Sequence, residues 1–272
     1  MQTILVPTDF SPEARNAAVH AAEMARAFNA KLFLFHAYLL PTPVSEVPYV
    51  MVTVDELQKE NESQLKKESE RLAQQFGLKV ESLVRIGIPS DEVKVLTEEI
   101  QPDLIVMGMK GMGGLDKMIG STTINAVRKV KIPVLIVPHD VPFRPIKVVT
   151  YASDLSYQIN SRLFQPLLTI LQSFEARLQI VHIHHHTETK PTEEASKKAL
   201  LQHFAAQKPA FDMITNSSIM AGIREYMDNH PCELLVMVSH KHTLLERLFT
   251  RDHTAQMAYK TNRPLLILQD RD

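Results

Sequence analysis

The second half of the 272-residue chain repeats the pattern of the first half, and this repeat limits the folds open to it. Apolar segments in the first half each have a counterpart in the second: 4–11 and 146–156, 32–36 and 178–182, 103–107 and 233–237, 132–137 and 263–268. Self-similarity over half the chain indicates two copies of one fold, because the repeats of a solenoid are shorter. Apolar strands that alternate with helical segments predict right-handed βαβ crossovers. We therefore expect two tandem α/β domains, each with a doubly wound parallel sheet.

A proline-rich segment marks the expected boundary between the copies. Residues 138, 142 and 145 are all proline. Because proline interrupts regular structure, this segment predicts a first domain over residues 1–140 and a second over 145–272. A second proline-rich segment, 39–53, has no clear period and predicts a loop.

Helix starts and stops follow from local capping residues. Ser11, with Pro12 and Glu13 after it, predicts the start of the first helix. A polar helix is expected over about 55–76, with Gly77 beyond its end. A further helix is expected from Ser90, and another from Ser121.

A glycine cluster is the strongest functional signal. Five of the eight glycines lie between Gly108 and Gly120, after the apolar strand 103–107 and before the helix that starts at Ser121. A strand, a glycine-rich loop and a helix N-terminus together favour phosphate binding by backbone N–H groups. The alternative is a tight turn without a ligand. In the second copy, Val238, Lys241, Arg251 and Asp252 replace Gly108, Gly111, Gly120 and Ser121, which predicts that the second site is lost.

Other candidate residues follow the first two strands. Asp9 and the pair His36-Ala37 stand where strands end, and ligands of parallel α/β sheets bind beyond those ends. Asp9 either accepts hydrogen bonds from a ribose or adenine, or bonds to backbone N–H groups in its own turn. Lys110 faces either a phosphate or solvent.

Bulk properties exclude several classes of protein. A net charge of -1 gives no reason to expect a nucleic-acid partner. No apolar run approaches the length of a membrane span, so no membrane partner is expected. The single cysteine, Cys232, and the absence of a targeting segment predict a cytoplasmic protein. Recognised catalytic motifs such as Gly-x-Ser-x-Gly and HExxH are also absent, so no catalytic residue is assigned.

The chain resembles the universal stress protein (UspA) family in its tandem two-domain form. The segments 4–11, 103–108 and 132–138 carry the resemblance, together with the Gly-x-x-Gly and Gly-Ser pairs of the loop. The resemblance implies two Rossmann-like domains of the adenine nucleotide alpha hydrolase type, each with a five-stranded parallel sheet. It also implies that the last strands of the two domains, 132–137 and 264–268, pair with each other.

The family's ATP-binding branch supplies an expected ligand and site. The implied cofactor is ATP, with or without Mg²⁺, bound in the N-terminal domain. Eight residues, 112–119, separate Gly111 from Gly120, one fewer than in the family's pattern. The residues expected to bind the nucleotide are Pro7, Thr8, Asp9, Ala37, Met107, Gly108, Lys110, Gly111, Gly120, Ser121 and Thr122.

The resemblance leads to one leading function and two alternatives. The leading one is a stress-response protein that binds ATP or a related adenine nucleotide and acts as a regulatory or interaction module. Its partners would be the nucleotide, an unknown regulatory protein and, in a homodimer, a second copy of the chain. The first alternative is slow ATP hydrolysis or another adenylate-handling activity, with Asp9 and Lys110 as candidates. The second is an interaction module without a nucleotide.

A histidine-rich run allows a metal hypothesis. His182, His184 and His186 share one face of a strand at two-residue spacing, and His240 and His242 follow the fourth strand of the second copy. His182 is also the repeat counterpart of His36, which indicates a structural role. We favour that structural role over a metal site.

Overall fold

Ten strands form one continuous sheet. The computed structural model describes residues 1–40, 53–109, 121–155, 160–184, 191–239 and 263–270. The strand order is β3-β2-β1-β4-β5-β10-β9-β6-β7-β8, so each half of the chain contributes five strands. The strands are β1 (Thr3–Pro7), β2 (Lys31–Tyr38), β3 (Val80–Ile86), β4 (Leu104–Met109), β5 (Val134–Pro138), β6 (Val148–Ala152), β7 (Arg177–His184), β8 (Ala210–Thr215), β9 (Leu234–Ser239) and β10 (Leu265–Gln269).

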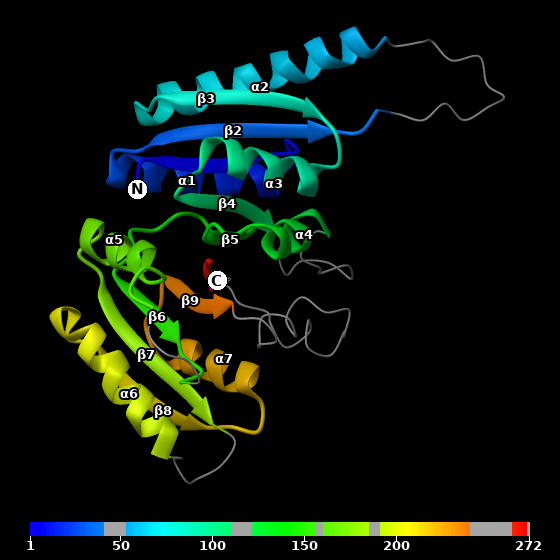
Figure 1. The fold of residues 1–272 in the computed structure, drawn as a ribbon. Helices are drawn as coiled ribbons and strands as arrows, with labels where there is room; N and C mark the ends of the chain where they lie inside the picture. Colours follow the sequence, from blue (N-terminus) through cyan, green and yellow to red (C-terminus); the bar gives the residue numbers. More distant parts are fainter. Residues whose placement is uncertain (41–52, 110–120, 156–159, 185–190, 240–262, 271–272) are drawn as a thin grey trace.

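The two halves join through β5 and β10. These strands are antiparallel, with Leu266 opposite Leu135, whereas the strands within each half pair in parallel. The pairing predicted for the last strands of the two copies is therefore confirmed. Figure 1 shows the first half above the second, with β5 and the C-terminal end of the chain at the centre. The proposed division into 1–140 and 145–272 falls between β5 and β6.

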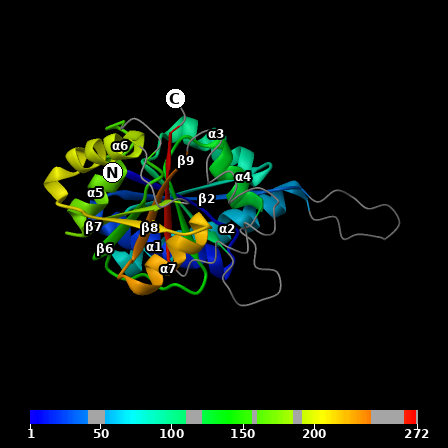
Figure 2. The same cartoon turned by 90° about the horizontal axis from the view of Figure 1, so that it is seen from below.

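Helices cover both faces of the sheet (Figure 1 and Figure 2). They are α1 (Pro12–Phe28), α2 (Val54–Phe76), α3 (Pro89–Ile100), α4 (Ser121–Lys129), α5 (Gln165–Ser173), α6 (Pro191–His203) and α7 (Ile219–Asn229). One apolar core contains buried residues of α1, α2, α5 and α6, and the other contains those of α3, α4 and α7. Strand residues alternate between the cores, as Ile4 and Val6 face the first and Leu5 the second. The α/β fold class is therefore confirmed.

Capping residues explain most of the helix boundaries. The Ala14 N–H donates to Ser11 Oγ at 3.2 Å, which confirms Ser11 as the N-cap of α1. Gly77 ends α2 with a left-handed φ of 66°. The start predicted at Ser90 was wrong by one residue, because α3 begins at Pro89, after Ile88, whose side chain makes no capping hydrogen bond. Proline is favourable in that first turn because its missing N–H has no helical acceptor there.

Two expected features lie outside the described residues. They are most of the proline-rich loop, residues 41–52, and the glycine loop, residues 110–120. Within the described residues, no helix combines the length and the apolar character needed to cross a membrane.

Candidate functional site

A pocket of about 190 Å³ opens at the carboxyl ends of β1, β2 and β4. In the first half, β1 lies between β2 and β4, so the strand order reverses direction at this point. Doubly wound sheets bind ligands in the crevice that such a reversal creates. The pocket is lined by Pro7, Thr8, Asp9, Ser11, Glu13, Ala14, Phe35, Ala37, Pro89, Val93, Met107, Gly108, Thr122 and Thr123.

Seven of the residues predicted from the sequence line this pocket together. They are Pro7, Thr8, Asp9, Ala37, Met107, Gly108 and Thr122. Ser121 is the first residue of α4, whose next two residues line the pocket. Lys110, Gly111 and Gly120 lie outside the described residues.

The turn after β1 is held against β2 by hydrogen bonds. The Thr8 N–H donates to the Phe35 carbonyl at 2.8 Å, and His36 Nδ1–H donates to the Thr8 carbonyl at 2.7 Å. Thr8 Oγ1 accepts the Phe10 N–H at 3.0 Å, and Phe10 has a left-handed φ of 63°. These bonds fix the direction in which the chain leaves β1, and so they fix the position of Asp9.

Asp9 makes a turn hydrogen bond and also lines the pocket. Its Oδ1 accepts the Ser11 N–H at 3.0 Å, which is the turn bond expected of an aspartate at this position. Asp9 is also exposed and lines the pocket, as does Glu13. Asp9 therefore offers hydrogen-bond acceptors to a ligand while it stabilises its own turn.

Gly108 is required by packing. A Cβ atom at this position would lie 2.5 Å from the Glu13 carbonyl oxygen and 3.0 Å from the Ala14 nitrogen. The end of β4 therefore touches the backbone of the first turn of α1. This contact brings Met107 and Gly108 to the same pocket as Asp9.

The N-terminus of α4 forms another wall. Thr123 is buried, and its hydroxyl donates to the Gly108 carbonyl at 3.2 Å, which fixes the helix start to the end of β4. Thr122 is exposed and lines the pocket. The first N–H groups of a helix have no partner within the helix, and so they are available to an anion.

Sequence reasoning missed half of the pocket lining. The residues it did not assign to the site are Ser11, Glu13, Ala14, Phe35, Pro89, Val93 and Thr123. Pro89 and Val93 belong to α3, which follows β3 at the same edge of the sheet. Their place in the crossover after β3 is the signal that could have identified them, since ligands bind at this edge.

The second half keeps the turn but fills the corresponding space. His182 Nδ1–H donates to the Ser153 carbonyl at 2.8 Å, and Leu155 has a φ of 55°, as in the turn at Thr8 and Phe10. In the equal-length strands β2 and β7, Ile183 takes the place of Ala37. Ile183 is buried against α7, where a Cβ on Gly222 would lie 2.7 Å from its Cγ2. An apolar side chain therefore occupies the position at which the first half has room.

The histidine run is structural where it is described. The bond from His182 to Ser153 confirms the structural role expected for His182. His184 Nε2 lies 3.0 Å from Thr215 Oγ1. Among the described residues, no group of three or more His, Cys, Asp or Glu side chains could hold a metal ion. His186, His240 and His242 lie outside that part of the chain.

Comparisons with known proteins agree with this architecture. Residues 1–138 match the model of the universal stress protein family. Universal stress protein MJ0531 of Methanocaldococcus jannaschii is 30% identical over 142 residues, which cover 49% of this chain and 80% of that protein. A crystal structure of a universal stress protein from Archaeoglobus fulgidus covers 98% of both chains with a TM-score of 0.76 at 15% identity, which supports the fold. Another universal stress protein, solved in complex with cAMP, is 31% identical over half of this chain, with a TM-score of 0.39.

Proposed function

Because the chain belongs to the universal stress protein family, we propose that its first half binds ATP or a related adenine nucleotide. The observation that carries this proposal is the pocket at the ends of β1, β2 and β4, which collects seven of the residues predicted from the sequence. The second half, whose corresponding space Ile183 fills, acts as a partner domain. The whole chain then works as a cytoplasmic regulatory or interaction module.

The nucleoside occupies the pocket itself. Its volume of about 190 Å³ is smaller than the roughly 300–1,000 Å³ of sites that enclose a drug-sized ligand. It therefore encloses only part of a nucleotide. Pro7, Ala37 and Val93 offer apolar surface to a purine ring, and Ala37 leaves room for it. Asp9 accepts hydrogen bonds from ribose hydroxyls or from an adenine amine.

The phosphates extend toward the start of α4. The free N–H groups of the first helical turn and the Thr122 hydroxyl donate to phosphate oxygens. Lys110, Gly111, Gly120 and Ser121 are the further residues that the sequence assigns to phosphate binding. Mg²⁺ bound with the nucleotide would offset the charge that the phosphates share with the acidic residues of the lining, Asp9 and Glu13.

The helix proposed to bind the phosphates, α4, makes a hydrogen bond to the second half of the chain. Gln269 at the end of β10 donates its Nε2–H to the Val127 carbonyl of α4 at 3.0 Å. The helix that receives the phosphates therefore touches the second half. A change in α4 on binding alters the surface that a regulatory protein or a second copy of the chain recognises.

The test introduces the isoleucine of the second-half position at the corresponding position of the first half. Ala37→Ile fills the pocket with the side chain found at Ile183, and Ala210→Ile adds the same atoms at an exposed position of β8. We expect titration calorimetry with ATP to show binding by the parent chain and by Ala210→Ile. Ala37→Ile should bind at least about tenfold more weakly, because the purine loses its space. Equal affinities for the two variants, or no binding by the parent at millimolar ATP, contradict the proposal.

A further inference from the structure

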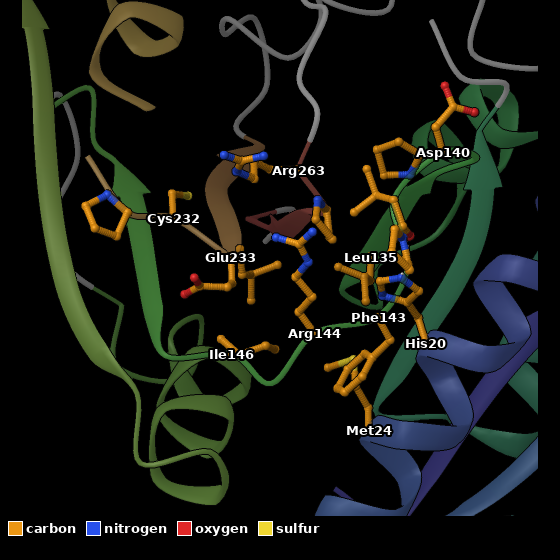
Figure 3. Close-up of a pocket in the computed structure, with 16 residues that line it drawn as sticks. His20, Met24, Leu135, Asp140, Phe143, Arg144, Ile146, Cys232, Glu233 and Arg263 are labelled. Atoms are coloured by element: carbon orange, nitrogen blue, oxygen red, sulfur yellow. Dashed lines mark hydrogen bonds between the residues drawn. The ribbon is translucent and has the colours of Figure 1, made fainter. Parts of the chain in front are cut away.

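A larger cavity, of about 490 Å³, lies between the two halves of the chain. Its walls come from α1, from β5 and the segment that follows it, and from the residues just before β9 and β10 (Figure 3). It shares no lining residue with the nucleotide pocket. The volume is in the range of sites that enclose small organic molecules, and such sites occur preferentially at domain interfaces.

We call this cavity between the two halves the seam cavity. Its inner walls are apolar. Met24, Leu135, Ile146 and Leu234 line it and are almost fully buried. Phe143 adds an aromatic ring that packs edge-on against His20, with ring centroids 5.4 Å apart. This surface favours a ligand with an apolar body.

One cationic group in the seam cavity is available to a ligand. Arg144 is exposed, and among the residues that the structure describes no carboxylate pairs with its guanidinium. Figure 3 shows this side chain extending between Glu233 and Leu135. Arg263, from the residue before Pro264 and β10, supplies a second guanidinium to the same lining. A guanidinium offers several N–H donors in a plane, which suits carboxylate, sulfonate and phosphate groups.

Neither acidic residue of the seam cavity forms an ion pair with Arg144 in the part of the chain that the structure describes. Glu233 Oε2 accepts the backbone N–H groups of Lys147 at 3.2 Å and Val148 at 2.8 Å. The carboxylate of Asp140 is exposed, lies 3.9 Å from His139 Nε2 and points away from the other labelled side chains in Figure 3.

His20 adds no charge to the seam cavity. Its Nε2–H donates to the Val141 carbonyl at 2.9 Å, and burial lowers its pKa, so the imidazole is neutral.

We propose that the seam cavity is a second ligand site, which takes a small organic anion with an apolar body. The apolar part lies against Met24, Leu135 and Ile146, and Arg144 holds the anionic group at the solvent-exposed side. A ligand bound there contacts both halves at once. It would therefore stabilise their association, since it binds the folded arrangement and not the unfolded chain.

Chemical modification of the only cysteine can show whether a ligand occupies the seam cavity. Cys232 lines the seam cavity and is buried, and burial raises the pKa of its thiol. A thiol-specific reagent therefore has one target in the protein. A ligand in the seam cavity should slow that reaction by blocking access.

The experiment uses the dye anilinonaphthalene sulfonate and its neutral analogue phenylnaphthylamine on the full chain. We expect saturable fluorescence enhancement by the sulfonate and slower methanethiosulfonate modification of Cys232 when the dye is bound. Arg144→Gln should weaken sulfonate binding by about tenfold or more and leave the neutral dye unchanged. Arg144→Lys should retain most of the affinity. Arg162→Gln, at an exposed arginine outside the cavity, should have no effect.

Three results would overturn this proposal. The first is sulfonate binding that Arg144→Gln does not weaken, and the second is binding that leaves the rate of Cys232 modification unchanged. Displacement of the dye by ATP, lost in Ala37→Ile, would place the dye in the nucleotide pocket and also reject the seam cavity. The first two results do not bear on whether ATP binds, and the third would reject the seam cavity while it supports ATP binding, so the two proposals stand or fall separately.

Discussion

His20 illustrates how one buried side chain can tie stability to pH. It lies on the inner face of α1 and is only 4% exposed. Its Nε2–H donates to the Val141 carbonyl, which holds the segment after β5 against the helix. Burial lowers its pKa below 6.5, because an imidazolium in this position would lose its hydration.

The lowered pKa predicts a loss of stability on acidification. The unfolded chain takes up a proton on this histidine near pH 6.5, whereas the folded chain does so only at lower pH. The unfolded state therefore binds more protons in this range, and the free energy of unfolding falls as the pH drops below about 6.5. Denaturant unfolding at about pH 7.5 and 5.5 measures the difference in the free energy of unfolding between the two pH values.

The His20→Gln variant isolates this contribution. Glutamine keeps a donor for the Val141 carbonyl but does not titrate. We expect a smaller loss of stability between the two pH values than in the parent. Some loss remains, because burial lowers the pKa of His203 as well. An unchanged pH dependence in His20→Gln would show that His20 does not contribute.

At the scale of elements, the backbones of α1 and β4 make a close contact in the first half. In the first half, α1 starts five residues after β1 ends, and its first turn touches Gly108. In the second half, α5 starts at Gln165, thirteen residues after β6 ends. The residues that correspond to Glu13 and Ala14, 158 and 159, lie outside the described residues, so the close contact at Gly108 is a feature of the first half as the structure describes it.

Gly108→Ala should separate β4 from α1. The added Cβ would lie 2.5 Å from the Glu13 carbonyl oxygen, and backbone atoms cannot move aside cheaply. We expect a loss of about 1–3 kcal/mol in the free energy of unfolding. Gly77→Asn is the control, because a Cβ there meets nothing within 4 Å and asparagine tolerates the left-handed end of a helix. Equal and small effects of both substitutions would contradict the close contact.

Local signals predicted most elements, and non-local contacts account for what they missed. Ser11 and Gly77 mark helix ends through bonds and backbone angles within a few residues, so the sequence alone locates them. The contribution of Pro89 and Val93 to the pocket depends on how α3 docks after β3, and no local pattern encodes it. The seam cavity forms only where β5 meets β10, so neither copy of the repeat contains a motif for it.

For the second half, the sequence likewise reveals only part of the reason why the binding site is lost. Loss of the glycines at Val238 and Lys241 is visible in the sequence. The filling of the pocket by Ile183 becomes clear only from its packing against Gly222 of α7. Alignment of β2 with β7 pairs Ile183 with Ala37, but the pairing has meaning only once Ala37 is known to line a pocket.

At the scale of the whole molecule, one sheet carries two unequal halves. The antiparallel pairing of β5 with β10 makes the core continuous across the junction, and each apolar core contains residues of both halves. The first half has an open pocket at its strand ends, whereas Ile183 fills the corresponding space of the second. We therefore expect one nucleotide site per chain, in the first half.

A crystal structure of the full chain grown with a non-hydrolysable ATP analogue tests this claim most directly. We expect one nucleotide per chain, with its nucleoside between Asp9 and Ala37 and its phosphates at the start of α4. The space around Ile183 should contain no nucleotide. A nucleotide bound in the second half, or an empty first-half pocket at saturating analogue, would show that the proposed site is wrong.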